Sequence, residues 1–269
     1  MIEISEMFIK YYNDMFKDKD NSHSGLQLLI YGYLFMHRDM RDEVNLSLEE
    51  LIRGCGYSVN RHSGKANKLF LDNLHYIVQQ NKSGHFNIKY KHHKKQINLT
   101  DRIILYLGEI IIDDEKYTKL PFDDFDIIVN SECKNKDNLI LMYLYLKSHF
   151  FERKKIKDNY GNIIGEEGNP RDNPVGYAID YDHIAYDTGL SKSTVIRVTD
   201  TLHSLKLIYN HTTGGYNDIK GKIKNAPNIY TLWKYQDEIE YVINKLKEVY
   251  KVDRFFALLN KKEKEVDKQ

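Results

Sequence analysis

The stretch "YDHIAYDTGLSKSTVIRVTDTLHSLKLIYN", residues 181–210, predicts two helices joined by a tight turn. Ala185 is a small residue in the first helix, and it allows a second helix to cross closely. Gly189 can adopt the positive φ at which a helix ends and which other residues resist. Val195 then anchors the second helix in a shared core, while the polar residues 191–194 leave its first turn free for contact. The stretch therefore predicts a helix-turn-helix motif.

The same plan occurs twice along the 269-residue chain. Each copy has an apolar helical segment, a shorter helix and a longer helix, in this order: residues 28–34, 47–57 and 58–77 in the first copy, and 140–146, 180–190 and 191–208 in the second. A hairpin-like segment follows each longer helix. The period of roughly 110–130 residues indicates a domain duplication rather than a solenoid.

The segments after the two long helices are interpreted as wings, which are β-hairpins beside a helix-turn-helix. The first runs from "YIVQQ" at 76–80 through a turn at 81–84 into residues 85–99. The second turns at Gly214–Gly215 and returns in "NIYTLW" at 228–233. Alternating apolar residues favour half-buried strands in both. A further insertion in the second copy contains "KIKDNYGNII", which predicts either a β-hairpin or an ordered loop.

This pattern predicts an α+β fold, mainly α, of two winged-helix domains in tandem with a C-terminal helical tail. The expected boundaries are a first domain over 1–108, an acidic linker over 109–130, a second domain over 131–234 and the tail over 235–269. A short helix is expected near residues 3–17. The tail has apolar residues at helical spacing, so it is expected to be amphipathic and could pair two copies of the chain.

Charge is distributed unevenly although the chain has 40 basic and 39 acidic residues. Residues 53–100 contain nine basic residues and one acidic residue, and residues 189–234 contain seven and two. Both regions cover a long helix and its wing, so positive charge gathers on the elements that a winged helix lays on DNA. Duplex DNA is the favoured partner. A solvated surface without a partner and an RNA partner remain as alternatives.

Other features exclude several classes of protein. Cys55 and Cys133 are too far apart for a metal motif and too few for a disulfide framework. No apolar run approaches the ~20 residues of a membrane span. Glu3 and Glu6 stand where a signal peptide would be basic. We therefore expect a cytoplasmic protein without membrane contact.

Residues with catalytic or metal-binding chemistry are present but lack suitable neighbours. His85, His92 and His93 have no cysteine or acid near them, which favours a basic surface over a metal site. The cluster "PFDDFD" at 121–126 is interpreted as an acidic turn. No phosphate-binding loop or nucleophile motif accompanies these residues. We expect no enzymatic activity, no metal and no cofactor.

The second copy resembles the winged helix-turn-helix superfamily. The resemblance rests on Ala185, Gly189, "SKSTVIRV" at 191–198, "LHSLKLI" at 202–208 and "NIYTL" at 228–232. The two-domain layout is similar to tandem winged-helix replication initiators of plasmids and phages, and to replisome organisers of Gram-positive bacteria. The resemblance covers residues 136–233 and, more loosely, 21–100.

The resemblance implies which residues would contact DNA. The second long helix would enter the major groove and present Ser191, Lys192, Ser193, Thr194, Arg197 and Thr201. Ser191 could equally be a helix cap. The corresponding residues of the first copy are Asn60, Arg61, His62, Lys65 and Lys68. The wings would contact the DNA backbone or minor groove through Lys82, His85, Lys89, Lys91, Lys94, Lys95, Lys220, Lys222 and Lys224.

The expected function is sequence-specific binding of duplex DNA in replication initiation or control of a plasmid or phage-like element. Transcriptional regulation, as a repressor of a mobile element, is the first alternative. A protein–protein adaptor is the second, with the first winged helix used for dimerisation or for recruiting a helicase loader. The expected partners are double-stranded DNA, a second copy of the chain, and replication or transcription machinery.

Overall fold

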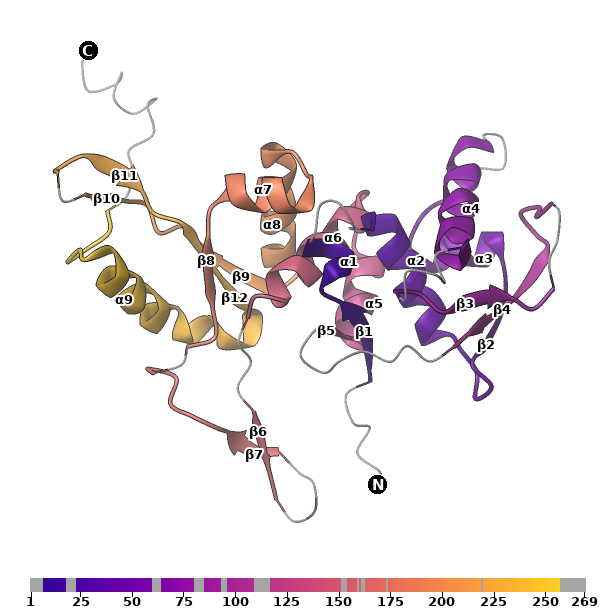
Figure 1. Ribbon diagram of the computed structural model, residues 1–269, viewed down its shortest axis with the longest axis horizontal. Coiled ribbons are helices and arrows are strands. Elements are labelled where there is room, and N and C mark those ends of the chain that lie inside the picture. Colours follow the sequence, from indigo (N-terminus) through magenta and orange to yellow (C-terminus); the bar gives the residue numbers. More distant parts are fainter. Residues whose placement is uncertain are drawn as a thin grey trace. The chain divides into compact units, whose positions relative to one another are not determined.

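The computed structural model describes residues 7–17, 23–59, 64–79, 85–92, 96–108, 117–150, 154–158, 160, 163–172, 174–218 and 220–256 (Figure 1). The chain forms two compact units, Met1–Ser148 and His149–Gln269. Both mix helices with β-strands, which confirms the expected combination of the two. Within the described ranges, no helix combines the length and the apolar character needed to cross a membrane.

Two apolar helices, α2 (Gly25–Met36) and α6 (Lys136–Lys147), pack together in the core of the first unit. Every residue of α6 from Leu139 to Leu146 is buried. A helix that is apolar on all sides is stable only when other elements surround it. The helices approach so closely that a Cβ on Gly25 would lie 2.0 Å from the carbonyl oxygen of Asp137. Glycine is therefore required there for steric reasons.

A three-stranded antiparallel sheet covers another part of the first unit. Its strands are β2 (Glu43–Ser47), β3 (Ile88–Tyr90) and β4 (Arg102–Leu107), in the order β2-β4-β3. Helices α3 (Leu48–Gly54) and α4 (Gly64–Gln79) lie between β2 and β3 in the chain. The Ser47 side chain accepts a hydrogen bond from the Glu50 amide and so fixes the start of α3.

The first wing differs from the sequence prediction. "YIVQ" at 76–79 belongs to α4 rather than to a strand, and the returning strand is β4, which comes after the segment expected to form the wing. Ile77 continues the apolar helical spacing set by Phe70 and Leu74, so helical packing overrides its β-propensity. The expected turn at 81–84 lies outside the described residues.

A two-stranded antiparallel ribbon joins distant parts of the first unit. It consists of β1 (Phe8–Tyr12) and β5 (Tyr117–Pro121). The expected helix over 3–17 is therefore mainly a strand, with only a short helix α1 (Asp14–Lys17) after it. The expected linker also differs, because β5 and helix α5 (Phe122–Asn130) pack into the unit; residues 109–116 lie outside the described part.

The second unit contains the helix pair predicted around Gly189. Strand β8 (Tyr177–Ile179) leads into α7 (Tyr181–Thr188), and α8 (Lys192–Ser204) follows after the turn. Gly189 has φ 70°, the left-handed conformation expected of it. Strands β9 (Ile208–His211) and β12 (Asn228–Leu232) complete a sheet of order β8-β12-β9.

The two copies thus share one topology. Apart from two additional hairpins in the second copy, each runs through a helix, a strand, two helices and two strands (Figure 1), and the last strand is central in the sheet in both. Helix α6 is the first element of the second copy, yet it belongs to the first compact unit. The compact boundary therefore falls after Ser148 and not near residue 131, because α6 needs α1, α2 and α5 to cover its apolar surface.

Two hairpins extend the second unit. The insertion forms β6 (Lys155–Lys157) and β7 (Ile163–Glu166), which confirms the hairpin interpretation of that segment. The second hairpin, β10 (Gly215–Asn217) with β11 (Ile223–Asn225), carries the wing lysines. Between its strands, Asp218 accepts hydrogen bonds from the backbone amides of Lys220 and Lys222, and Gly221 has a positive φ of 72°. Gly214, with a φ of 90°, and Gly215 lie where the chain passes from β9 to β10.

The tail packs within its own chain. A 3-10 helix, η2 (Trp233–Glu238), leads into α9 (Ile239–Tyr250). Val242 and Leu246 of α9 are buried against Ile229 of β12. Part of the apolar stripe of this helix is therefore covered within the chain, whereas Val249 is 76% exposed, and the pairing of two chains through this helix stays a prediction.

Candidate functional site

The start of α8 is fixed by Ser191. Its hydroxyl accepts a hydrogen bond from the Thr194 amide at 3.2 Å and lies 2.8 Å from the Thr194 hydroxyl. Ser191 is thus the N-cap of the helix, one of the two roles considered for it. Its hydroxyl group and that of Thr194 are consequently used in holding the turn.

Helix α8 separates a buried row from an exposed row. Val195, Val198, Thr199 and Leu202 are buried and hold the helix in the unit. The opposite side exposes residues at the spacing i, i+3, i+4 and i+7: Ser193, Ile196, Arg197 and Asp200. We call these four residues the α8 face. It offers a hydroxyl, an apolar side chain, a guanidinium and a carboxylate to solvent.

Two members of the α8 face, Ile196 and Asp200, were not among the predicted site residues. Ile196 is 37% exposed, an unusual position for an isoleucine on a helix with a buried apolar row. Its spacing from Ser193 could have indicated the exposed face, but its apolar character suggested a core position. Only the packing of α8 distinguishes Ile196 from Val195.

Arg197 and Lys192 differ in whether their charged groups form an ion pair within the protein. Arg197 is exposed and forms no ion pair with any residue that the structure describes. The ammonium nitrogen of Lys192, in contrast, lies 2.7 Å from a carboxylate oxygen of Asp182 on α7. The Thr201 hydroxyl donates to the backbone oxygen of Arg197 at 2.8 Å, so its predicted role as a contact residue is weakened.

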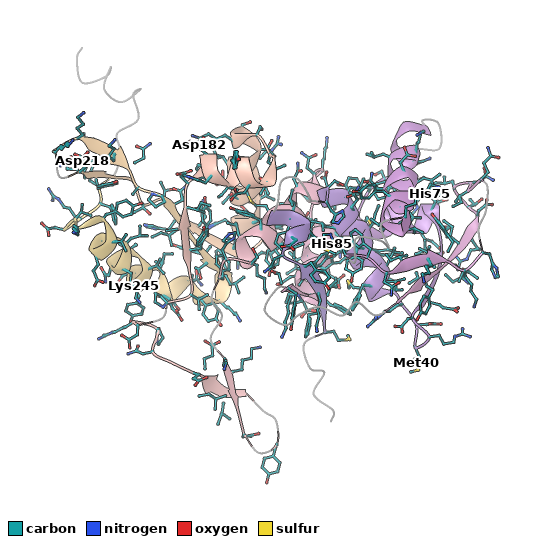
Figure 2. All side chains as sticks on the ribbon, viewed as in Figure 1. Met40, His75, His85, Asp182, Asp218 and Lys245 are labelled. Atoms are coloured by element: carbon teal, nitrogen blue, oxygen red, sulfur yellow. The ribbon has the colours of Figure 1, made fainter. Side chains whose placement is uncertain are left out.

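The β10–β11 hairpin presents three lysines, Lys220, Lys222 and Lys224, all exposed. The Asp218 carboxylate accepts hydrogen bonds from the backbone amides of Lys220 and Lys222, at 2.9 and 2.8 Å (Figure 2). This acid is thus occupied in forming the turn. Within the described ranges, none of the three ammonium groups has a carboxylate partner.

On the long helix of the first unit, α4, the predicted cation whose side chain is described, Lys68, is paired. Four of the predicted contacts lie outside the described residues, namely Asn60, Arg61, His62 and the side chain of Lys65. The Lys68 ammonium is 2.7 Å from the Asp72 carboxylate, an i,i+4 ion pair on the helix surface. Leu69 and Tyr76, two turns apart on α4, are exposed by 55% and 39%. The described part of α4 thus presents apolar as well as charged groups.

The positive charge of the first wing is also partly neutralised by an acidic residue. Lys89 of β3 is exposed, but the Lys91 ammonium lies 2.7 Å from Glu43. Lys82, Lys94 and Lys95 lie outside the described residues.

His85, a predicted contact residue, is half-buried and has neighbours inside the first unit. Its Nδ1 is 3.0 Å from Nε2 of the buried His23, and its ring also contacts Tyr12 (Figure 2). Burial, assisted by His85, lowers the pKa of His23 to about 4, so His23 is neutral at physiological pH. His85 therefore contributes to the interior of the first unit.

The structure also locates the groups considered for catalysis or metal binding. "PFDDFD" begins helix α5 rather than forming a turn, and Asp124 accepts a hydrogen bond from the Tyr143 hydroxyl. Burial raises the pKa of the Cys55 thiol well above its usual value, which opposes thiolate chemistry. Among the described residues, no three histidine, cysteine or acidic side chains are grouped so that they could hold a metal ion.

No known protein-family model matches the chain, and no curated protein sequence is significantly similar to it. The function is therefore inferred from residues and geometry. The second unit contributes most to it, through the α8 face and the three exposed lysines of the β10–β11 hairpin.

Proposed function

We propose that the protein binds duplex DNA through two winged-helix domains in tandem, with α8 as the main reading helix. The observation that carries this proposal is the α8 face. A capped helix after a left-handed glycine turn buries one apolar row and presents Ser193, Ile196 and Arg197 to solvent. The shared order of strands in the two sheets supports a tandem arrangement.

The α8 face has the chemistry required to read base edges in the major groove. A free guanidinium can donate two hydrogen bonds to O6 and N7 of guanine. An exposed isoleucine can contact the thymine methyl group, and a carboxylate can accept from the cytosine amino group. Ser193 can contact a phosphate or an adaptable base position. Arg197, Ile196 and Asp200 are thus the proposed specificity residues.

The lysines of the β10–β11 hairpin would contact the phosphate backbone. Each phosphate that they neutralise releases condensed counterions, so binding should weaken steeply as salt is added. The first domain would add a second, weaker contact through Lys89. Tethering raises the effective concentration of this second contact and therefore the overall affinity.

The biological process proposed is replication initiation or control of a plasmid or phage-like element, in the cytoplasm and without enzymatic activity. Transcriptional regulation fits the same site. A protein-adaptor role for the first domain is favoured by one observation, namely that Leu69 and Tyr76 are exposed on α4. Apolar side chains at i and i+7 form a stripe that a partner protein could cover.

The test is Arg197→Ala, measured on the best duplex recovered by in vitro selection from random sequences. A bidentate arginine–guanine contact contributes about 1–3 kcal/mol, so affinity should fall about 5- to 150-fold. Melting should hardly change, because Arg197 is exposed and unpaired among the described residues. Arg254→Ala, which removes another exposed arginine, serves as the matched control and should leave affinity nearly unchanged. Equal effects of the two substitutions would contradict the proposed reading role.

A further inference from the structure

The β1–β5 ribbon of the first unit has two faces of different composition. Ile9, Tyr11, Thr118 and Leu120 are buried on its inner face. On its outer face the antiparallel register sets six residues in three directly opposed pairs: Phe8 with Pro121, Lys10 with Lys119, and Tyr12 with Tyr117. Aromatic rings therefore lie on both sides of a central pair of lysines.

The central pair is unfavourable for the ribbon by itself, because like charges directly opposite each other destabilise a sheet. No carboxylate in the described part of the chain pairs with Lys10 or Lys119. The ammonium groups lie instead over neighbouring rings: Lys10 is 4.6 Å from the centroid of Tyr117, and Lys119 is 4.6 Å from that of Phe8. The outer face thus combines positive charge that no described carboxylate neutralises with partly exposed aromatic rings.

We propose that this outer face binds single-stranded DNA. When Lys10 and Lys119 move from the faces of Tyr117 and Phe8 to the phosphates, bases of a single strand can stack on the two rings. A duplex cannot use the rings in this way, because the faces of its bases are covered by neighbouring base pairs. Tyr12 already contacts His85, so Phe8 and Tyr117 are the assigned stacking residues.

The ribbon is long enough for a short segment of single strand. Strand β1 runs from Phe8 to Tyr12, and its ends are therefore about 13 Å apart at the rise of an antiparallel strand. The choice of DNA over RNA rests on the proposed function, since a DNA strand would be available where a bound duplex opens. The stacking surface itself does not depend on α8 or on the β10–β11 hairpin.

The competing explanation is that the lysines and rings stabilise only the ribbon through cation–π contacts. Replacing both rings by leucine separates the two explanations. Leucine keeps apolar bulk on the ribbon, but it offers no π face to a base. Phe8→Leu with Tyr117→Leu should therefore remove base stacking, while melting of the full-length variant shows whether the ribbon has survived.

The experiment measures binding of a labelled oligothymidylate of about 20 nucleotides, longer than the site of a typical single-strand-binding fold. The Phe8→Leu/Tyr117→Leu protein should bind it at least about fivefold more weakly for each ring that is replaced. Tyr160→Leu is the matched control, because Tyr160 is 91% exposed but lies outside the ribbon. Lys10→Gln with Lys119→Gln should flatten the log–log salt dependence by about 1.4, or 0.7 for each phosphate that is no longer neutralised.

Binding of a random-sequence duplex of the same length distinguishes this proposal from the proposed function. The ribbon variants should retain duplex binding, whereas Lys220→Ala with Lys222→Ala and Lys224→Ala should weaken it and leave oligothymidylate binding unchanged. Unchanged oligothymidylate affinity in the leucine variant, or an equal reduction in Tyr160→Leu, would overturn the stacking assignment. Tighter binding of oligouridylate than of oligothymidylate would overturn the choice of DNA. A wild-type protein that binds duplex but no single strand would refute this inference alone.

Discussion

Substitution of Asp182 by asparagine should strengthen DNA binding. The Asp182 carboxylate holds the Lys192 ammonium at 2.7 Å, and both side chains are well exposed, by 72% and 54%. To reach a phosphate, Lys192 must give up this ion pair. An exposed pair of this kind contributes about 0.2–1 kcal/mol, so its removal should raise affinity by about 1.4- to fivefold.

The salt dependence of DNA affinity is a second quantity that this substitution should change. If Lys192 binds an additional phosphate in the Asp182→Asn protein, the slope of log affinity against log salt should steepen by about 0.9. The assay is an anisotropy titration of a selected duplex between ~50 and ~200 mM salt, the range over which added salt weakens such binding by orders of magnitude. Thermal stability should change little, because the broken pair is solvent-exposed.

Two controls make the result specific to Lys192. Asp237→Asn removes the same charge from another exposed site in the second unit, and it should leave the slope unchanged. Lys192→Ala combined with Asp182→Asn should abolish the increase in affinity, because the released cation is then absent. An increase that persists without Lys192, or an affinity that does not rise, would refute the placement of Lys192 at the DNA backbone.

Two further predictions concern stability. Gly25→Ala should destabilise the protein by about 1–3 kcal/mol in urea unfolding, because the new Cβ would lie 2.0 Å from the Asp137 carbonyl oxygen, although alanine is the better helix former. Gly189→Ala should lower the free energy of unfolding by only about 1 kcal/mol, because the new Cβ meets a positive φ but no neighbouring atom. A larger effect of Gly189→Ala than of Gly25→Ala would contradict the close crossing of α2 and α6. Folding lowers the pKa of His23 from 6.5 to about 4, so the unfolded chain binds more protons between these pH values. The free energy of unfolding should therefore decrease as the pH is lowered from 6.5 to about 4. His23→Phe should reduce that pH dependence in urea titrations, and an unchanged dependence would exclude His23 as its source.

Local signals in the sequence predicted much of the second unit. Gly189 and Ser191 mark a helix end and a helix start through their own backbone preferences and hydrogen bonds, and the structure has α7 and α8 at those positions. The segment "NIYTL" likewise was expected to be a strand and is β12, but it is fully buried rather than half-buried, because it is the central strand of its sheet. The insertion is a hairpin for the same kind of local reason, with β-branched residues on either side of a turn.

The first unit was harder to predict, because its pairings join residues far apart in the chain. Phe8 lies opposite Pro121 in the β1–β5 ribbon, and nothing in either segment alone selects the other. The expected helix near residue 10 and the expected linker near residue 120 were both incorrect for this reason. The apolar pattern of α6 indicated a buried helix, but not that α2 would be the helix that covers it.

The availability of charge was also decided by tertiary structure. From the sequence alone, Lys91, Lys192 and Arg197 are equivalent cations in basic regions. Folding brings Glu43 to Lys91 and Asp182 to Lys192, and it leaves Arg197 without an ion-pair partner among the described residues. The amino-acid sequence by itself therefore determined where α7 ends and α8 begins, because caps and glycine turns act over a few residues, whereas α8 ends at Ser204 and not at the expected residue 208. Only the tertiary structure decided which cations remain free and which strands pair, because those interactions join residues of different elements that the chain separates by ten or more positions.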